Sequence, residues 1–259
     1  MSPGLNGHQS QSTLARATIS TFGLVAWILF AAVPASAQFP DTFTNLKFFP
    51  KDISSQELMQ TMRGFSFALG TRCEHCHVQN SDGKFDFAAD TKSPKQTARV
   101  MLRMVASVNR DFVGQIGKDN PVKVECATCH HGLTEPRQLK SVLEDSLDHK
   151  GLDATIAQYQ ELRKRYDATG AYDFSDTTLN LVTEWLMAQH RNKEAAAIME
   201  MNFAANKTDS VWAYHLLAMA HEANGEKQKA RDDFRRVVEL HPDDSWAKQQ
   251  LERLSARDR

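Results

Sequence analysis

Two copies of one short pattern constrain this chain more than any other feature of its sequence. The segment CEHCH at 73–77 and the segment CATCH at 126–130 each hold two cysteines three positions apart, followed directly by a histidine. This C-x-x-C-H spacing is typical of the covalent attachment of c-type haem. On a short helical turn each thiol can form a thioether with one haem vinyl group, and the following imidazole then reaches the iron. We therefore predict two covalently attached haem c groups, held by Cys73, Cys76, Cys126 and Cys129, with His77 and His130 as proximal iron ligands.

Three other uses of paired cysteines compete with haem attachment. Two disulfides would suit an exported chain, and four thiolates arranged as two C-x-x-C pairs can bind zinc. Both interpretations leave the histidine after each pair unexplained, twice over. A thioredoxin-like redox motif requires a βαβ context, which the sequence does not indicate. Haem attachment is the interpretation that gives every cysteine and histidine of the pattern a role.

The first 37 residues have the layout of a secretory signal peptide. A polar leader with Arg16 precedes an apolar run over about residues 19–33, and the small residues ASA at 35–37 offer a cleavage site. A spanning helix needs about 20 apolar residues, so this run is short for a membrane anchor. No cysteine for lipid attachment follows the small residues. The sequence predicts a periplasmic chain that starts near Gln38 and has no stable membrane span, with a retained N-terminal anchor as the alternative.

Charge and size narrow the function classes. The chain has 31 Lys and Arg against 32 Asp and Glu, which gives no reason to expect nucleic acid as a partner. Removal of a signal peptide would leave about 220 residues, enough for one large or two modest domains. All four cysteines lie before residue 130, and none lies in the second half. We therefore expect the chain to divide near Pro136.

A helix before the first attachment segment supplies candidates for the sixth iron ligand. Ser54 and Glu57 fit a capping box at its start, and Gly70 fits a C-terminal stop. Apolar residues recur between them at helical spacing and form one face. Met62 is central on this face, where its thioether could reach the iron, and Met59 competes from one turn away. The alternative is that Met62 is a core methionine, the usual role of Met on such a face.

The second attachment segment has a matching helix. Ser93-Pro94 offers an N-cap followed by Pro at the first helical position. Apolar residues between 98 and 112 line one side of this helix, and Met104 or Met101 could bind the second iron. His131 is a further alternative, although adjacent positions such as His131 and the proximal histidine before it rarely face the same iron.

These segments resemble the photosynthetic reaction-centre cytochrome c subunit family. The resemblance covers about residues 43–137 and rests on FSFALGTRCEHCH with the helix before it, on RVMLRMVASVN and on VECATCHHG. Members of this family use a repeated unit, in which a helix carries a Met ligand and a tight turn leads into C-x-x-C-H, with pairs of haems around a local twofold. Met62, eleven residues before Cys73, and Met104, twenty-six residues before His130, match the Met placement in two such units. The resemblance implies that Met62 and Met104 are the sixth ligands.

The chain departs from this family in two respects. The family's namesake has four haems, whereas this chain has two attachment segments, and it lacks the lipoprotein cysteine that often anchors such subunits. Delivery of electrons to a photosynthetic reaction centre therefore does not follow from the resemblance. Two-haem versions resemble general periplasmic electron carriers, and this is the role that the resemblance implies here.

The chain after Pro136 has a different pattern. It lacks strand-like alternation, and its amphipathic segments joined by short polar turns indicate helices. Residues 211–242 resemble the tetratricopeptide repeat (TPR), with Ala218 and Ala230 letting two helices approach and Pro242 ending the pair.

Further copies of the TPR pattern are weaker. About 35 residues before the clear repeat, residues 179–199 reproduce much of it. Residues 151–166 resemble the second helix of a truncated unit, and residues 246–254 are expected as a closing helix with a polar outer side. Arrays of this kind present a concave face to protein or peptide ligands.

The patterns together predict an all-α protein: a signal peptide at 1–37, a c-type dihaem cytochrome domain of helix–turn–CxxCH units at 38–137, and a TPR-like helical-repeat domain at 138–259. The predicted function is electron transfer between redox partner proteins without enzymatic catalysis, with the TPR face docking a protein or peptide. A dihaem peroxidase is an alternative, but it needs an open iron position beside an acid–base group, and methionines occupy both expected distal helices. A haem-based redox sensor or scaffold that acts through the TPR face is the other alternative.

Overall fold

The computed structural model describes residues 42–117, 119 and 121–256. The signal peptide predicted at 1–37 lies outside the described residues. Among the described residues the structure is helical apart from one short antiparallel pair, β1 (Val78–Gln79) and β2 (Phe85–Asp86). The all-α prediction is thus confirmed. In the same described part of the chain, no helix combines the length and the hydropathy that a membrane crossing requires.

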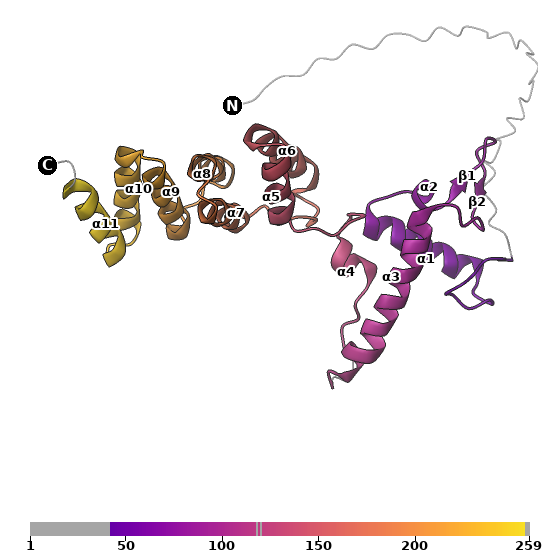
Figure 1. Ribbon diagram of the computed structural model, residues 1–259. Coiled ribbons are helices and arrows are strands. Elements are labelled where there is room, and N and C mark those ends of the chain that lie inside the picture. Colours follow the sequence, from indigo (N-terminus) through magenta and orange to yellow (C-terminus); the bar gives the residue numbers. More distant parts are fainter. Residues whose placement is uncertain (1–41, 118, 120, 257–259) are drawn as a thin grey trace, which may run out of the picture. The chain divides into compact units, whose positions relative to one another are not determined.

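Residues 42–132, called the attachment region below, contain both C-x-x-C-H segments (Figure 1). Its helical elements are α1 (Ser55–Leu69), α2 (Cys73–Cys76), α3 (Ser93–Ser107), the π-helical turn η1 (Val108–Phe112), the 3₁₀ turn η2 (Val113–Gln115) and α4 (Cys126–His130). Helix α1 packs against α4, and α2 packs against α3. The first segment, in α2, therefore contacts the long helix α3 that precedes the second segment. The second segment, in α4, contacts the long helix α1 that precedes the first.

The ends of α1 are those that the sequence predicts. The Ser54 hydroxyl accepts a hydrogen bond from the Glu57 backbone N–H at 3.1 Å, which satisfies one donor of the first turn. Gly70 ends the helix with a φ of 61°, in the left-handed region that favours glycine.

The start of α3 differs from the expectation by one residue. Ser93 is the first helical residue rather than the N-cap, and Lys92 precedes the helix with an extended backbone and no side-chain cap. Pro94 remains in the first turn, where its missing N–H leaves no helical hydrogen bond unmade. The Ser-Pro signal therefore predicted the helix but misplaced its boundary.

Residues 139–256, called the repeat region below, form seven helices (Figure 1). They are α5 (Leu139–His149), α6 (Leu152–Tyr166), α7 (Asp176–Ala188), α8 (Asn192–Asn206), α9 (Val211–Ala223), α10 (Lys227–Leu240) and α11 (Ser245–Ala256). Successive helices pack as pairs, α5 on α6, α7 on α8 and α9 on α10, with α11 against α10. The predicted closing helix is present as α11. The unit that contains α6 was expected to be truncated, but it is a complete pair, because α5 supplies the first helix and packs on α6.

Small residues set the spacing of the α9–α10 pair. Ala218 and Ala230 are both fully buried and belong to one apolar cluster with Phe234. Without large side chains at these two positions, the helices approach closely enough for Phe234 to pack between them. The TPR-like hairpin predicted for residues 211–242 is thus present in the structure.

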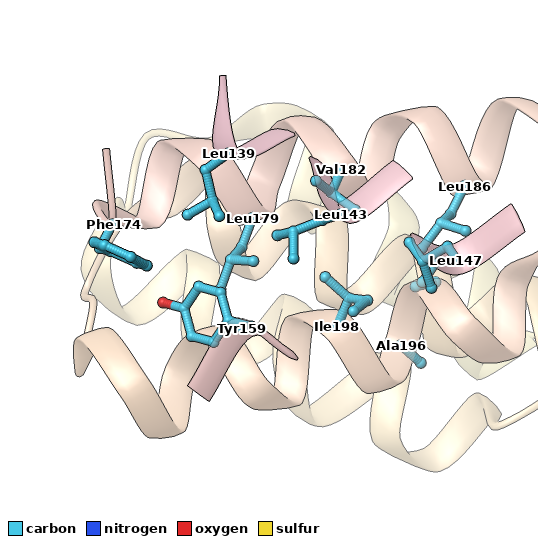
Figure 2. Close-up of a cluster of buried hydrophobic side chains, with 12 residues drawn as sticks. Leu139, Leu143, Leu147, Tyr159, Phe174, Leu179, Val182, Leu186, Ala196 and Ile198 are labelled. Carbon is cyan, nitrogen blue, oxygen red and sulfur yellow. The ribbon is translucent and has the colours of Figure 1, made fainter. Parts of the chain in front are cut away.

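The buried apolar core lies in the repeat region. Figure 2 shows its largest cluster, in which leucines of α5 and α7 point toward one another. Its buried members come from α5 to α9 and from the loop before α7, and they are Leu139, Leu143, Leu147, Tyr159, Phe174, Leu179, Val182, Leu186, Ala195, Ala196, Ile198 and Ala220. Among the described residues of the attachment region, Ala68 is by contrast the single buried apolar side chain. The two regions are therefore stabilised in different ways.

Candidate haem-binding sites

The first attachment segment is a single helical turn. Gly70 turns the chain, α2 then spans Cys73–Cys76, and the His77 backbone N–H donates to the Cys73 carbonyl at 2.9 Å. Both thiols therefore lie on one turn, Cys73 exposed and Cys76 half-buried. Burial raises the pKa of the Cys76 thiol, and nearby Lys92 opposes that shift. The turn presents two thiols on one side and the imidazole of His77 directly after them.

His77 is held neutral by its surroundings. Its ring contacts the Phe87 ring edge-to-face at 5.1 Å between centroids. Burial lowers the pKa of His77, and the charges of Lys95, Arg99 and Lys92 lower it further, against an opposing effect of the Phe87 backbone. The neutral imidazole is the form that binds a metal, so these surroundings suit His77 to be an iron ligand.

The second attachment segment repeats this arrangement with a firmer hold on its histidine. Helix α4 spans Cys126–His130, and the Glu125 N–H donates to the Thr128 hydroxyl at 3.0 Å at its start. His130 is buried, with 8% of its surface exposed, and its Nδ1 lies 2.7 Å from the Leu133 carbonyl. A carbonyl can only accept, so Nδ1 carries the proton and Nε2 is left with its lone pair for a metal.

Asn109 holds the chain that leads into the second segment. Its Nδ2 donates to the Val124 carbonyl at 2.7 Å, and the Val124 N–H donates to its Oδ1 at 2.8 Å. Asn109 lies in the π-helical turn η1, a kind of irregular turn that is frequent at functional sites. The side chain thus acts like a partner strand two residues before Cys126. Sequence reasoning missed this role, because nothing local in the sequence pairs position 109 with position 124.

A contact between two glycines joins the attachment segments. The Gly132 N–H donates to the Ala68 carbonyl at 2.9 Å, which links the end of α1 to the turn after α4. A Cβ added at Gly70 would lie 2.0 Å from the Gly132 carbonyl oxygen. Only glycine fits at position 70, both for this approach and for its positive φ.

The candidate methionines lie on the long helices. Met59 and Met62 are half-buried on α1, Met101 is half-buried on α3, and Met104 on α3 is 45% exposed. The choice of sixth ligand, Met62 or Met59 and Met104 or Met101, stays a prediction. His131 adopts a left-handed backbone with φ 46° and is exposed.

The surface of the attachment region matches the chemistry of a haem. Large apolar side chains are unusually exposed there, and they are Phe48, Phe67, Val100, Met104, Phe112, Ile116 and Val122. Exposed apolar surface of this kind marks a ligand or interaction site. Two thiol pairs, the imidazole after each pair and this apolar surface together fit two haem groups, with Cys73, Cys76, Cys126, Cys129, His77 and His130 as the residues that would hold them.

The competing cysteine chemistries find no support in the geometry. All four thiols are free, and none is joined to another cysteine in the described part of the chain. Nor do the described residues gather three or more His, Cys, Asp or Glu side chains into a group that could hold a metal ion. A zinc site would need the four thiolates together, and the described residues do not bring them together.

Comparison with known proteins identifies the family. The photosynthetic reaction centre cytochrome C subunit family matches residues 8–228, which is more than half of the chain. The chain belongs to this family. The tetratricopeptide repeat family matches residues 211–254 in addition, across α9 to α11.

Two curated relatives are similar to part of this chain. It is 38% identical to cytochrome c-554 of Chloroflexus aurantiacus over 80 residues, 30% of this chain and 18% of that protein. It is 34% identical to the photosynthetic reaction center cytochrome c subunit of Rubrivivax gelatinosus over 85 residues, 29% of this chain and 22% of that one. The match thus spans about a fifth of the length of each relative.

Solved structures with some likeness to the chain are TPR domains. One is the first TPR of Spaghetti (RPAP3) bound to an HSP90 peptide. The match covers 46% of this chain and 89% of that structure's chain, with 18% identity and a TM-score of 0.33. The Arabidopsis OM64 TPR domain covers 45% and 90%, with 21% identity and a TM-score of 0.32. TM-scores this low support no conclusion about the function of this chain.

Proposed function

We propose that this chain is a periplasmic two-haem c-type cytochrome that transfers electrons between redox partner proteins. The observation that carries the proposal is the repeated site: a one-turn helix with two free thiols, followed by an imidazole whose surroundings leave it able to bind iron. Haem supplies one-electron chemistry when bound, and the protein sets its potential and position. The chain needs no acid–base residue for this role, which is therefore not enzymatic.

The roles of the residues follow from the two sites. Cys73, Cys76, Cys126 and Cys129 anchor the groups through thioethers. His77 and His130 are the proximal ligands, and Met62 and Met104 are the sixth ligands that the family resemblance implies. Methionine ligation raises the reduction potential relative to two histidines. Methionine on both irons would leave neither one open to peroxide, which favours a carrier over a peroxidase.

The repeat region is proposed as a docking module. Seven stacked helices with their own core present a continuous surface to a protein or peptide, as helical repeats do. This surface would hold a docked redox partner on the same chain as the attachment region. The export predicted from residues 1–37 supports a periplasmic location. The proposed haem groups support it as well, because c-type haem is attached outside the cytoplasm.

Haem counting and optical spectra test the proposal on the full chain, produced with haem maturation. A pyridine haemochrome assay is expected to give two haems per chain, and one in a variant with both Cys126→Ala and Cys129→Ala. The ferric and ferrous spectra are expected to be low-spin, with a far-red methionine–iron band and no response to carbon monoxide. A high-spin fraction that binds carbon monoxide or reacts with peroxide would overturn the carrier assignment in favour of a peroxidase or sensor.

A further inference from the structure

A partly buried group of positive charges distinguishes the first attachment segment from the second. Lys92, Lys95 and Arg99, called the first-site cations below, lie at the start of α3, which packs against α2. The side chains of Lys95 and Arg99 are each only 11% exposed. Asp90 pairs with both, at 3.1 Å from Lys95 and 2.8 Å from Arg99.

Specific contacts place these cations beside the first segment. The Lys92 ammonium donates to the carbonyl of Glu74, which lies between the two cysteines of α2. Lys95 donates to the carbonyls of Phe87, Ala88 and Ala89 at 2.7 to 3.1 Å. Phe87 in turn has its ring against the ring of His77. The first-site cations therefore lie beside α2 and beside the loop that contains Phe87, whose ring contacts the proximal histidine.

The carboxylates near the first segment do not cancel the positive charge of the first-site cations. Asp90 is 27% exposed and is shared with a third cation, Lys47, at 2.7 Å. The carboxylates of Glu74 and Asp86 are exposed, so water and salt screen them. Buried charges act over the same distance with much less screening.

The second segment has no such group among its described residues. The charged side chains from 123 to 137 are Lys123, Glu125, Glu135 and Arg137, two positive and two negative. All four are exposed, so their charges are screened as well as balanced. His130 is instead positioned by an uncharged partner, the Leu133 carbonyl.

We propose that the first-site cations make the haem held by Cys73 and Cys76 the higher-potential haem of the pair. The inference rests on the proposed electron-transfer function. Reduction lowers the positive charge of the iron by one, and buried positive charge nearby destabilises the ferric state more than the ferrous state. An electron that enters the chain from a donor protein is therefore more stable at the first site, and the second site has the lower potential.

Redox titration of the full, haem-loaded chain tests the inference with charge changes of opposite sign. Two one-electron waves are expected. Arg99→Gln removes a positive charge and should lower the potential of the upper wave, whereas Asp90→Asn removes the opposing negative charge and should raise the potential of that same wave. Damage to the fold would not move the potential of one wave in opposite directions.

Two controls separate charge from structure. Arg99→Lys keeps the charge and should leave the upper wave close to its original potential. Arg103→Gln removes an exposed charge one turn further along α3 and should move neither wave. The inference is overturned if Arg99→Gln and Asp90→Asn move the lower wave, or if they move neither wave in a chain that holds two haems. A chain that holds fewer than two haems overturns the proposed function and this inference with it.

Discussion

Leu133 acts through its backbone rather than its side chain. Its carbonyl accepts the Nδ1 proton of His130 at 2.7 Å and so decides which nitrogen of that imidazole is available to a metal. At the first segment the His77 ring is instead positioned by an edge-to-face contact with the Phe87 ring. The two histidines, equivalent in sequence, thus differ in what holds them.

Asn109 should be required for the second haem and not for the first. Asn109→Ala would leave the N–H and carbonyl of Val124 without their partners, and an unsatisfied buried hydrogen-bonding group costs about 1–3 kcal/mol. We expect the chain before Cys126 to loosen and the pyridine haemochrome count to fall toward one haem per chain. Gln115→Ala, which removes one exposed hydrogen bond to Asp111, should keep two haems and serves as the control. An unchanged count in the Asn109 variant would contradict this role of the Asn109–Val124 hydrogen bonds.

Gly70 should not tolerate a methyl group. Gly70→Ala forces a non-glycine residue to a φ of 61° and places its Cβ 2.0 Å from the Gly132 oxygen, so the backbone must shift. A residue held in the left-handed region costs about 1–3 kcal/mol by itself. Gly83→Ala has a similar φ, 80°, with nothing within 4 Å of its Cβ, and isolates that cost. Thermal unfolding should show a larger loss of Tm for Gly70→Ala than for Gly83→Ala, and equal losses would mean that the contact with Gly132 is unimportant.

At the scale of elements, Arg191 joins α8 to α5. It pairs with Glu194 at 2.6 Å and with Asp148 at 2.7 Å, and it donates to the Leu147 carbonyl at 3.1 Å. The hydrogen bond from Arg191 is the main reason that the pKa of Glu194 is lower than its ordinary value of 4.5. A single positive side chain therefore connects the first and second helical pairs of the repeat region.

Acid should weaken this connection. Because the pKa of Glu194 is lower in the folded chain than in the unfolded chain, the pair stabilises the fold fully above about pH 4.5, and this stabilisation is lost as the pH falls through the folded pKa. Glu194→Gln should lower the free energy of unfolding by about 1 kcal/mol or less at pH 7, since the pair is partly exposed. Chemical denaturation at pH 7 and at lower pH checks this, and the difference from the wild type should shrink on acidification.

A more exposed ion pair provides the comparison. Asp232 pairs with Arg235 with both side chains more than half exposed. Asp232→Asn should leave the denaturation midpoint nearly unchanged at either pH. If it lowers the midpoint as much as Glu194→Gln does, burial and helix connection are not what makes the Arg191 pair matter.

Sequence patterns predicted the elements well where local chemistry decides them. The caps of α1 follow from Ser54 and Gly70. The α9–α10 hairpin follows from the small residues at 218 and 230. Helix α5 was missed as part of a repeat, although Leu139, Leu143 and Leu147 recur at helical spacing, because its TPR resemblance is weak. The Asn109–Val124 hydrogen bonds and the Gly70–Gly132 contact join positions far apart in the sequence, and no local pattern specifies such partners.

At the scale of the whole molecule, the two regions differ in what fills their interior. The repeat region buries leucines, Tyr159 and Phe234, whereas the described residues of the attachment region bury little apolar surface and expose Phe67 at 82% and Val122 at 91%. The apolar surface that a porphyrin brings is of the kind that would complete the attachment region. Haem is then expected to be a structural component of one region and irrelevant to the stability of the other.

A core substitution can test this separation. Leu143 is fully buried, and Leu→Ala changes in cores cost about 2–5 kcal/mol. Leu143→Ala should lower the midpoint of helix unfolding measured by circular dichroism, while the haem absorption spectrum and the haem count stay those of the wild type. The surface change Lys193→Ala on α8 should alter neither signal. Loss of haem in the Leu143 variant would show that the two regions are stabilised as one unit.

The separate core of the repeat region has a consequence for chains that fail to mature. A chain without haem still has the leucine core of α5 to α8 and the Phe234 cluster, so we expect residues 139–256 to fold. Such a chain would still present the surface proposed for docking and could occupy a partner while passing no electron. An immature copy would then act as a competitor of the mature one, which gives a cell a reason to degrade apoprotein rather than tolerate it.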